Sequence, residues 1–433
     1  MYYQEDIETI SNQDLKAIQL EKLKKLVGDT ALKIDFYKKS FENHGVSVQD
    51  INTLEDITKF PFTTKQDMRN AYPFKMFAVN REEVVRVHCS SGTTGTATVV
   101  GYTQKDIDDW ADCFARCLVM ADGSAKSMVQ VSYGYGLFTG GLGAHHGAHR
   151  LGATVLPTSS GNTKRQIQLM KDFNADILCC TPSYALLIAD TAISMGLDPA
   201  KDFKLSYGIL GAEPFSEGMR KEIEAKLGIC VLDIYGLSEI MGPGVSCECE
   251  CKNGLHINED HFLIEIIDPV SLQPVEDGEY GEVVFTTLSK ECSPLVRYRT
   301  RDISRIIPGK CACGRTHRRM DRISGRSDDM LIIRGVNVFP SQIEEVISAF
   351  KEVTMYYQIV LSTKGALDHI ELLIEPTEDF AFDEVRKIED LKRRIASELK
   401  SNLQVSVAIR IVESKSIARS EGKAVRVIDN RLK

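Results

Sequence analysis

The first fifty residues carry apolar side chains at the spacing of a helix. Among charged and polar neighbours, apolar residues recur at Leu15, Ile18, Leu23, Leu26 and Leu32. This pattern predicts amphipathic helices with one buried face. A proline between two phenylalanines at positions 60–62 interrupts it. We therefore expect a helical surface layer that ends near residue 60.

Beyond residue 84, short apolar runs alternate with longer amphipathic stretches. The runs predict strands at 84–88, 127–132, 153–156, 177–180, 205–210 and 231–234. The stretches predict helices at 104–122, 163–173, 183–195 and 216–227. Strands that alternate with helices in this way build a largely parallel sheet.

From about residue 255 the segments become shorter and turn-rich. Alternating stretches at 262–267, 281–286 and 303–307 predict a small antiparallel barrel or sheet. The last hundred residues predict strands at 330–333, 358–361, 369–374 and 405–412, with helices from Ser341 and over 383–401. The chain is therefore predicted to be an α/β protein. It would have an N-terminal domain over 1–327, with a β-rich subdomain at about 245–327, and a small α+β domain over 328–433.

Composition narrows the class of protein. The chain has 433 residues and a net charge of −8, with no block of lysine and arginine long enough to track nucleic acid. It has no run of 18 apolar residues, and its charged N-terminus lacks the apolar core of a signal peptide. Most of its twelve cysteines are isolated, which indicates a reduced cytoplasm. We therefore expect neither nucleic acid nor membrane as a partner.

Five cysteines are not isolated: three alternate over residues 247–251, and two lie at Cys311 and Cys313. Cys249 and His256, together with that pair, would supply three sulfurs and one imidazole. This is an established ligand set for structural zinc, and it leaves no open coordination position. Free structural thiols and a redox role are the alternatives. The choice of ligand among the three alternating cysteines is open.

The segment that follows the first predicted strand concentrates hydroxyls and glycines: Ser90, Ser91, Gly92, Thr93, Thr94 and Gly95. Glycine lets the backbone approach an anion closely, and hydroxyls donate to phosphate oxygens. No Gly-Lys-Ser/Thr follows, so the segment is not a Walker A loop, which argues against a P-loop kinase or NTPase.

Further motifs follow this loop in a fixed order. They are Tyr-Gly-Leu-Ser-Glu at 235–239, Tyr-Arg-Thr-Arg-Asp at 298–302, Gly-Arg-Ser-Asp-Asp at 325–329, Arg-Gly-Val-Asn-Val-Phe-Pro at 334–340 and Gly-Lys at 422–423. The ordered set resembles the adenylate-forming (acyl-activating) enzyme superfamily. Stretches at 133–141, 254–256, 324–344 and 420–424 resemble its phenylacetate–coenzyme A ligases, and the resemblance covers essentially the whole chain.

The chain departs from the superfamily pattern in two places. The superfamily loop usually continues with a Pro-Lys or Lys-Pro pair, whereas Thr96-Ala97-Thr98 carries no charge. No lysine of this loop can therefore assist the leaving pyrophosphate. The proline usually found before the terminal Gly-Lys segment is also absent, and Ala418 stands near its place.

The resemblance implies a two-step reaction with ATP, Mg²⁺ and coenzyme A. A carboxylate attacks the α-phosphate of ATP and expels pyrophosphate, and the thiolate of coenzyme A then displaces AMP. Because the first step joins two anions, the site must supply positive charge and N–H donors. The implied substrate is an aryl acid, with phenylacetate as the default and indoleacetate, hydroxyphenylacetate and benzoate-like acids as alternatives. The resemblance also implies a homodimer and a place in phenylacetate catabolism.

The same resemblance assigns residues to roles. Lys423 matches the adenylation lysine, Glu239 the carboxylate that binds Mg²⁺, and Asp302 the acceptor of the ribose hydroxyls. The motifs place further nucleotide contacts at Gly211, Ala212, Glu213, Asp233, Tyr235, Gly236 and Arg326.

Small residues beside aromatic ones suit a flat acyl group. The candidates for the acyl pocket are Tyr135, Phe138, Gly140, Ala212 and Pro243.

The C-terminal domain of the superfamily rotates between the two half-reactions. Asp328 matches its hinge. After rotation, the pantetheine tunnel of coenzyme A would be lined by Arg334, Gly335, Val336 and Asn337.

Two other functions fit parts of the sequence. One is an adenylation enzyme that loads a carrier protein instead of coenzyme A. The other is a non-catalytic sensor of nucleotide or acyl-coenzyme A, against which the presence of Lys423, Glu239 and Asp302 argues.

Overall fold

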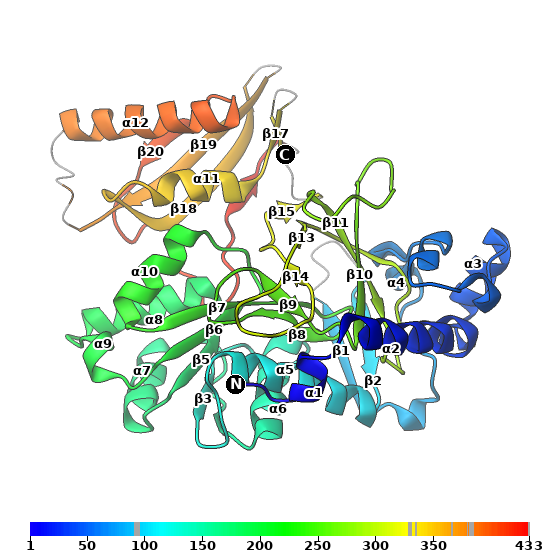
Figure 1. Ribbon diagram of the computed structural model, residues 1–433. Coiled ribbons are helices and arrows are strands. Elements are labelled where there is room, and N and C mark those ends of the chain that lie inside the picture. Colours follow the sequence, from blue (N-terminus) through cyan, green and yellow to red (C-terminus); the bar gives the residue numbers. More distant parts are fainter. Residues whose placement is uncertain are drawn as a thin grey trace. The chain divides into compact units, whose positions relative to one another are not determined.

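The chain folds as two compact units, whose elements are labelled in Figure 1. The computed structural model describes residues 1–90, 96–327, 331–333, 336–364, 367–378, 380 and 385–431. The first unit comprises Met1–Cys180, Phe203–Ala212 and Cys230–Arg322, and the second comprises Thr181–Asp202, Glu213–Ile229 and Ile323–Lys433. The domain boundary predicted at 327 and 328 stays a prediction, since residues 328–330 lie outside the described part.

Short helices form the N-terminal layer of the first unit, as the apolar pattern predicts. They are α1 (Glu5–Glu8), α2 (Asn12–Lys25), η1 (Leu26–Thr30), η2 (Ala31–Lys33), α3 (Asp35–His44), η3 (Val48–Asp50), η4 (Glu55–Lys59), α4 (Lys65–Asn70) and η5 (Arg81–Glu83). Leu15, Leu23 and Leu26 are buried, whereas Leu32 is 41% exposed. The layer continues past residue 60 to α4 and η5, further than predicted.

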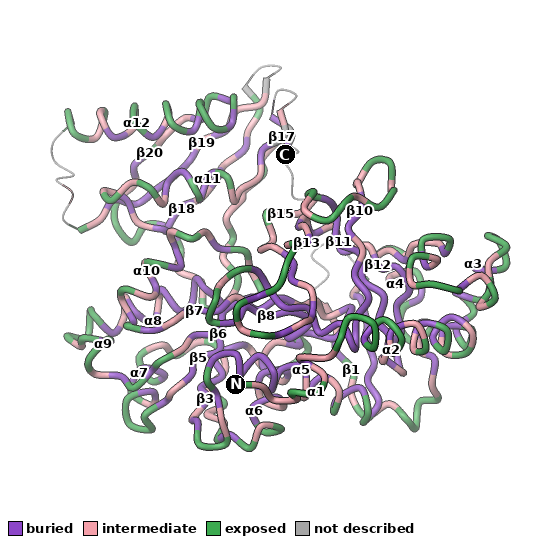
Figure 2. Tube along the Cα trace, in the orientation of Figure 1, coloured by how far each residue is buried: buried purple, intermediate pink, exposed green. Residues whose placement is uncertain are grey.

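A mixed sheet forms the centre of the first unit, and nine strands of the described residues belong to it. The parallel part consists of β4 (Thr154–Leu156), β3 (Met128–Val131), β5 (Ile177–Cys180), β6 (Tyr207–Gly211) and β7 (Cys230–Leu237). The sheet continues antiparallel through β8 (Gly242–Glu248), β9 (Leu255–Ile257), β14 (Arg319–Met320) and β13 (Ile306–Ile307). Its central strands are largely buried (Figure 2), as their apolar runs require. The predicted parallel arrangement is confirmed for the five strands from 127–132 to 231–234, whereas the strand predicted at 84–88 lies in a separate antiparallel pair.

Two further groups of strands complete this unit. The pair β1 (Arg86–Ser90) and β2 (Thr98–Tyr102) is antiparallel and flanks the phosphate-loop candidate. The strands β10 (Phe262–Ile267), β11 (Gly281–Thr287) and β12 (Tyr298–Ser304) pair in turn as antiparallel neighbours. The predicted strand at 303–307 is thus divided between β12 and β13.

Beyond the N-terminal layer, the helices of the first unit are α5 (Gln104–Met120), α6 (Thr139–Leu151) and α7 (Thr163–Asp172). The sequence pattern did not predict α6, because glycines weaken helix propensity along it. Its glycines permit close packing on α5. A Cβ at Gly143 would lie 2.5 Å from the ring of Trp110, and one at Gly147 would lie 2.4 Å from Cβ of Phe114.

The second unit contains a mixed sheet, with both antiparallel and parallel strand pairs, and several helices. Its helices are α8 (Pro182–Ser194), α9 (Pro199–Asp202), α10 (Glu217–Leu227), α11 (Pro340–Ser348) and α12 (Val385–Leu403). Its sheet has the order β20 (Ala408–Ile411), β19 (Leu367–Pro376), β18 (Val353–Lys364) and β21 (Val427–Asp429). Shorter strands are β15 (Gly325–Arg326), β16 (Leu331–Ile333) and β17 (Val336–Val338). The predicted α+β character is confirmed, and β18 is longer than the predicted strand at 358–361.

Among the helices of the described residues, none combines the length and apolar character needed to cross a bilayer.

Candidate active site

The carboxyl ends of β6 and β7 carry several predicted nucleotide contacts. At the end of β6, a Cβ on Gly211 would lie 2.2 Å from the carbonyl oxygen of Ile234 in β7. At the end of β7, a Cβ on Gly236 would lie 1.9 Å from the carbonyl oxygen of Gly242. Ala212 has a φ of 72°, a left-handed conformation that is strained for a residue other than glycine. Tight packing and local strain at this edge of an α/β sheet are typical of a ligand site.

Asp302 lies on a bulge of β12 and contacts Tyr235. The pairing of β11 with β12 shifts by the bulge around Arg301, which has a φ of 70°. The hydroxyl of Tyr235 donates a 2.6 Å hydrogen bond to Oδ2 of Asp302, and both residues are buried. The ring of Tyr235 stacks on Phe285 with 6.2 Å between centroids. The structure thus brings together two predicted nucleotide contacts and fixes the orientation of both side chains.

Glu239 lies in the turn that follows β7, residues 238–241, which we call the Glu239 turn. Its side chain is only 5% exposed, and Oε1 lies 3.0 Å from Nζ of Lys65. Lys65 is the first residue of α4, a region in which the sequence had suggested no functional residue. A carboxylate oxygen is a hard ligand of the kind that Mg²⁺ prefers, and Lys65 balances the charge of this carboxylate in the structure as it stands.

A buried lysine and a tyrosine fix the Glu239 turn through hydrogen bonds to its backbone. Nζ of Lys290 donates a 2.9 Å hydrogen bond to the carbonyl oxygen of Ile240, and the hydroxyl of Tyr102 donates one of 2.9 Å to that of Met241. The ammonium also lies 4.3 Å from the centroid of the Tyr102 ring. Burial lowers the pKa of Lys290 to about 8. These bonds fix the backbone that carries Glu239.

Aromatic side chains connect this turn to the start of the phosphate loop. The rings of Tyr102 and Trp110 stack with 5.2 Å between centroids, and His88 meets both edge-on. Nε1 of Trp110 donates to the carbonyl oxygen of Pro243 at 2.8 Å, and Nδ1 of His88 pairs with that of Leu137 at 3.0 Å. A carbonyl oxygen can only accept, so Nδ1 is the donor in this bond, and burial lowers the pKa of His88. Trp110 is the chain's single tryptophan, and it was not among the site residues predicted from the sequence.

The acyl-pocket candidates occupy the segment that leads into α6. The hydroxyl of Tyr135 lies 3.3 Å from Nδ1 of His145, and burial raises its pKa. Phe138 is 53% exposed, and a Cβ on Gly140 would make ordinary contact with the Tyr133 ring. Pro243 lies directly beside α6, since a Cβ on Gly143 would lie 2.8 Å from its Cγ. The assignment of the pocket stays a prediction.

In the second unit, Glu213 holds the segment that carries Lys423. One carboxylate oxygen of Glu213 accepts from the backbone N–H of Ser183, and the other accepts from that of Ala424, each at 2.8 Å. The hydroxyl of Thr181 donates to the carbonyl oxygen of Gly422 at 3.1 Å. Glu213 is thus bonded to the backbone next to Lys423, and both are also bonded to the start of α8.

For the remaining predicted site residues the structure gives mainly their position in the fold. Arg326 lies in β15, Val336 in β17, and Asp233 in β7, where Nε of Arg322 pairs with its carboxylate at 3.2 Å. Ser90 ends β1. Outside the described residues lie Ser91, Gly92, Thr93, Thr94, Gly95, Asp328, Arg334, Gly335 and the side chain of Asn337.

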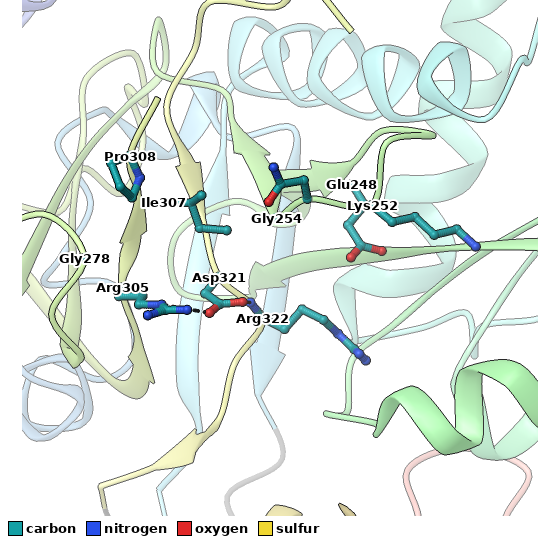
Figure 3. Close-up of a pocket in the computed structure, with 10 residues that line it drawn as sticks. Glu248, Lys252, Gly254, Gly278, Arg305, Ile307, Pro308, Asp321 and Arg322 are labelled. Atoms are coloured by element: carbon teal, nitrogen blue, oxygen red, sulfur yellow. Dashed lines mark hydrogen bonds and ion pairs between the residues drawn. The ribbon is translucent and has the colours of Figure 1, made fainter. Parts of the chain in front are cut away.

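A cavity of about 340 Å³ lies in the first unit next to the β8–β9 connection (Figure 3). Its wall includes Glu248, Lys252 and Arg322, and Arg305 pairs with Asp321 at 3.0 Å across it. Because its lining combines opposite charges that are partly paired, the cavity does not favour one charge of ligand.

Four predicted metal ligands lie together in the first unit. The ligand atoms of Cys249, His256, Cys311 and Cys313 all lie within 4.8 Å of one another. Sγ of Cys249 is 3.6 Å from Sγ of Cys311, and Nε2 of His256 is 3.3 Å from Sγ of Cys313. Nδ1 of His256 faces the carbonyl oxygen of His317 at 3.3 Å, so Nε2 is directed at the sulfurs.

The cluster connects two loops of the antiparallel part of the large sheet. Cys249 and His256 flank the β8–β9 connection, and the other two ligands lie between β13 and β14. Cys247 is buried within β8 and Cys251 is exposed, and the group formed by the described residues includes neither. Hydrogen bonds, first from Cys249 and then from His256, lower the pKa of Cys313 to about 2. The pKa of the partner thiol, Cys249, is raised in turn, first by its hydrogen bond to Cys313 and then by burial.

Comparison with known proteins gives consistent matches. Residues 12–288 match the family of AMP-binding enzymes, and residues 335–431 match the AMP-binding enzyme C-terminal domain. A phenylacetate–coenzyme A ligase of Escherichia coli is 52% identical over 98% of this chain and 97% of its own length. Those of Pseudomonas putida and Thermus thermophilus are 50% and 47% identical, over 98% and 100% of this chain and 96% and 100% of their own.

Solved structures also resemble the chain. A 2-hydroxyisobutyryl-CoA ligase with 2-HIB-AMP, in the postadenylation state, superposes with a TM-score of 0.93 at 28% identity, over 99% of this chain and 92% of its own. The same ligase with 2-HIB-AMP and CoA matches over the same shares with a TM-score of 0.74. An anthranilate CoA ligase, 16% identical with a TM-score of 0.58 over 81% of this chain and 67% of its own, supports the fold alone.

Replacing Glu213 by glutamine should loosen the segment next to Lys423. Glutamine offers one acceptor oxygen instead of two, so one backbone N–H would face an amide donor, at a cost of about 1–3 kcal/mol. Hydrogen exchange measured by mass spectrometry should become faster at residues 183–184 or 420–424. Glu217→Gln is the control, since that carboxylate is 51% exposed. Unchanged exchange at both segments in Glu213→Gln would contradict the role of this carboxylate.

Proposed function

Since the chain belongs to the AMP-binding enzyme family, we propose that it is an AMP-forming acyl-coenzyme A synthetase that acts on phenylacetate or a similar aryl acid. It converts the acid to its coenzyme A thioester through an acyl-adenylate and releases AMP and pyrophosphate. One observation carries this conclusion: the chain is 47–52% identical, over nearly its full length, to several phenylacetate–coenzyme A ligases. The relatives reported above are coenzyme A ligases, which favours coenzyme A over a carrier protein as the acceptor.

In the first half-reaction the carboxylate oxygen bonds to the α-phosphorus of ATP, and pyrophosphate leaves with the bonding electrons. Lys423 would lie between the two anions, and Asp302, already oriented by Tyr235, would accept the ribose hydroxyls. Glu239 would hold Mg²⁺, which supplies positive charge to the phosphates. The rigid Glu239 turn fits this role, because a buried carboxylate held by backbone bonds loses little freedom when it binds an ion.

In the second half-reaction the thiolate of coenzyme A attacks the acyl carbon, and AMP leaves. Asp328 would serve as the hinge between the half-reactions, and residues 334–337 would line the path of pantetheine. Nucleotide contacts at 90–95 and at Arg326 belong to the same proposal. The acyl group would lie among Tyr135, Phe138, Gly140, Ala212 and Pro243.

The Cys/His cluster suits a structural zinc ion. Three sulfurs and one imidazole nitrogen are arranged at short range, and the histidine is oriented by a backbone carbonyl. Zinc at this position would connect the β8–β9 and β13–β14 loops and leave no open coordination position. Its contribution would be to stability and not to bond making.

The setting of the enzyme is also a proposal. The twelve cysteines, all within the described residues, are free thiols, which supports a reducing compartment such as the cytoplasm. The homodimer stays a prediction.

The substrate is tested by a panel of carboxylic acids, with coenzyme A and ATP, in an assay of AMP and thioester formation. We expect phenylacetate or a close aryl acid to give the highest kcat/KM. Lys423→Ala should lower pyrophosphate release by about 10²–10³-fold, because the site loses a cation at the reacting anions.

Lys400→Ala, at the exposed end of α12, is the matched control and should keep full activity. Formation of a thioester only on a carrier protein would refute coenzyme A as the acceptor. Full pyrophosphate release by Lys423→Ala would refute the assignment of that lysine.

Metal analysis of the purified protein should find about one zinc ion per chain. Cys313→Ser should abolish zinc binding and lower the melting temperature, because three remaining ligands no longer complete the tetrahedron. Cys251→Ser changes an exposed cysteine nearby and should keep the zinc. Protein without stoichiometric zinc, or Cys313→Ser protein that retains it, would contradict the proposal.

A further inference from the structure

The leaving pyrophosphate needs positive charge that the phosphate loop does not provide. The loop continues with Thr96-Ala97-Thr98, where the superfamily usually has a lysine. Pyrophosphate carries several negative charges, and its departure is favoured by a cation held near its oxygens. A basic side chain from another part of the chain can add this charge to the charge that Mg²⁺ supplies.

Lys65 is a partly exposed lysine that the structure places at the Glu239 turn. Its Nζ lies 3.0 Å from Glu239, whereas 40% of its own side chain is exposed. The ammonium is thus anchored at the carboxylate proposed to bind Mg²⁺ and still has room to contact a ligand. Lys290 cannot take this role, because it is 2% exposed and its ammonium is bonded to Ile240 and covered by Tyr102.

The backbone before Lys65 is fixed to the strand that carries Asp302. The N–H of Thr63 donates to the carbonyl oxygen of Arg297 at 3.0 Å, and the N–H of Arg299 donates to that of Thr63 at 2.9 Å. The hydroxyl of Thr63 donates to the carbonyl oxygen of Val296 at 2.6 Å. Thr64 then caps α4. Lys65 is therefore held in a fixed relation to both Glu239 and β12.

We propose that Lys65 is a catalytic residue that binds the β- and γ-phosphates of ATP and the leaving pyrophosphate, in place of the lysine missing from the loop. This inference rests on the proposed function. As the carboxylate oxygen bonds to the α-phosphorus, the bond from that phosphorus to the bridging oxygen breaks, and its electron pair leaves with pyrophosphate. Lys65 keeps its protons and compensates this charge through hydrogen bonds.

Calorimetric titration with ATP, pyrophosphate and AMP, each with Mg²⁺, tests the proposal without turnover. Lys65→Met should weaken ATP and pyrophosphate about 10–100-fold, the usual cost of a hydrogen bond to a charged group. AMP lacks the β- and γ-phosphates, so its affinity should be unchanged. Lys65→Arg retains the charge and should retain most of the pyrophosphate affinity.

Lys59→Met is the matched control. Lys59 lies six residues earlier, is 49% exposed and pairs with Asp56 at 2.7 Å. This variant should bind all three ligands as the wild type does. Thermal melting of each variant checks that the fold is intact.

A compensating substitution sharpens the test. Thr96 is exposed and is the first residue of the uncharged stretch 96–98, in which the superfamily usually carries its Pro-Lys or Lys-Pro pair. Thr96→Lys should restore pyrophosphate affinity and adenylation rate in the Lys65→Met protein by about tenfold or more, and should change the wild type much less.

Three results would overturn the proposal. The Lys65→Met protein would bind pyrophosphate with wild-type affinity, or it would lose AMP affinity as strongly as pyrophosphate affinity. In the third case, Thr96→Lys would raise its pyrophosphate affinity by no larger a factor than it does in the wild type. A wild-type protein that binds ATP and pyrophosphate but makes no acyl-coenzyme A would refute the proposed function instead. The titrations would still decide the role of Lys65.

Discussion

Two anions must meet in the proposed reaction, and the chain has to compensate their charge with a small number of well-held cations. Lys65 and the Glu239 turn provide the clearest example. A carboxylate that is 5% exposed lies 3.0 Å from an ammonium that is 40% exposed, so the ammonium is held in place and still has an exposed side from which to contact phosphate. Charge held in this way needs little reorganisation during the reaction, and for that reason it is effective.

The rigidity of this arrangement comes from groups that never touch the substrate in our account. Burying Lys290 is costly, and the cost is offset by the carbonyl oxygen of Ile240 and the ring of Tyr102. Trp110 stacks on that ring and donates to Pro243. One buried polar and aromatic cluster therefore connects the Glu239 turn with a candidate of the acyl pocket. Close packing of α6 on α5, which the glycines allow, keeps Trp110 in place.

Much of this architecture was predictable from the sequence, because strands that are buried on both faces consist of continuous apolar residues. The strands β3 to β7 and helices α5, α7, α8 and α10 follow that pattern. The helix α6 does not follow that pattern. Its glycines lower the helix propensity but allow close contact with Trp110 and Phe114. The four cluster ligands could be proposed from residue type, but only the fold separates Cys249 from Cys247 and Cys251. Lys65 could not be predicted, because a strand pairing distant in sequence places it beside Glu239. The phosphate loop and hinge lie outside the described residues, so their geometry adds nothing to the motifs.

The central claim is that an acyl-adenylate forms first and coenzyme A then accepts the acyl group. Rapid-quench analysis of a single turnover tests it most directly. Enzyme in excess is mixed with phenylacetate, or with the preferred aryl acid, and ATP; coenzyme A is added after a delay. The account predicts enzyme-bound acyl-AMP together with an equal amount of pyrophosphate before the addition, and conversion to acyl-coenzyme A and AMP after it. Thioester formation without any acyl-AMP, or acyl-AMP that coenzyme A does not consume, would contradict it.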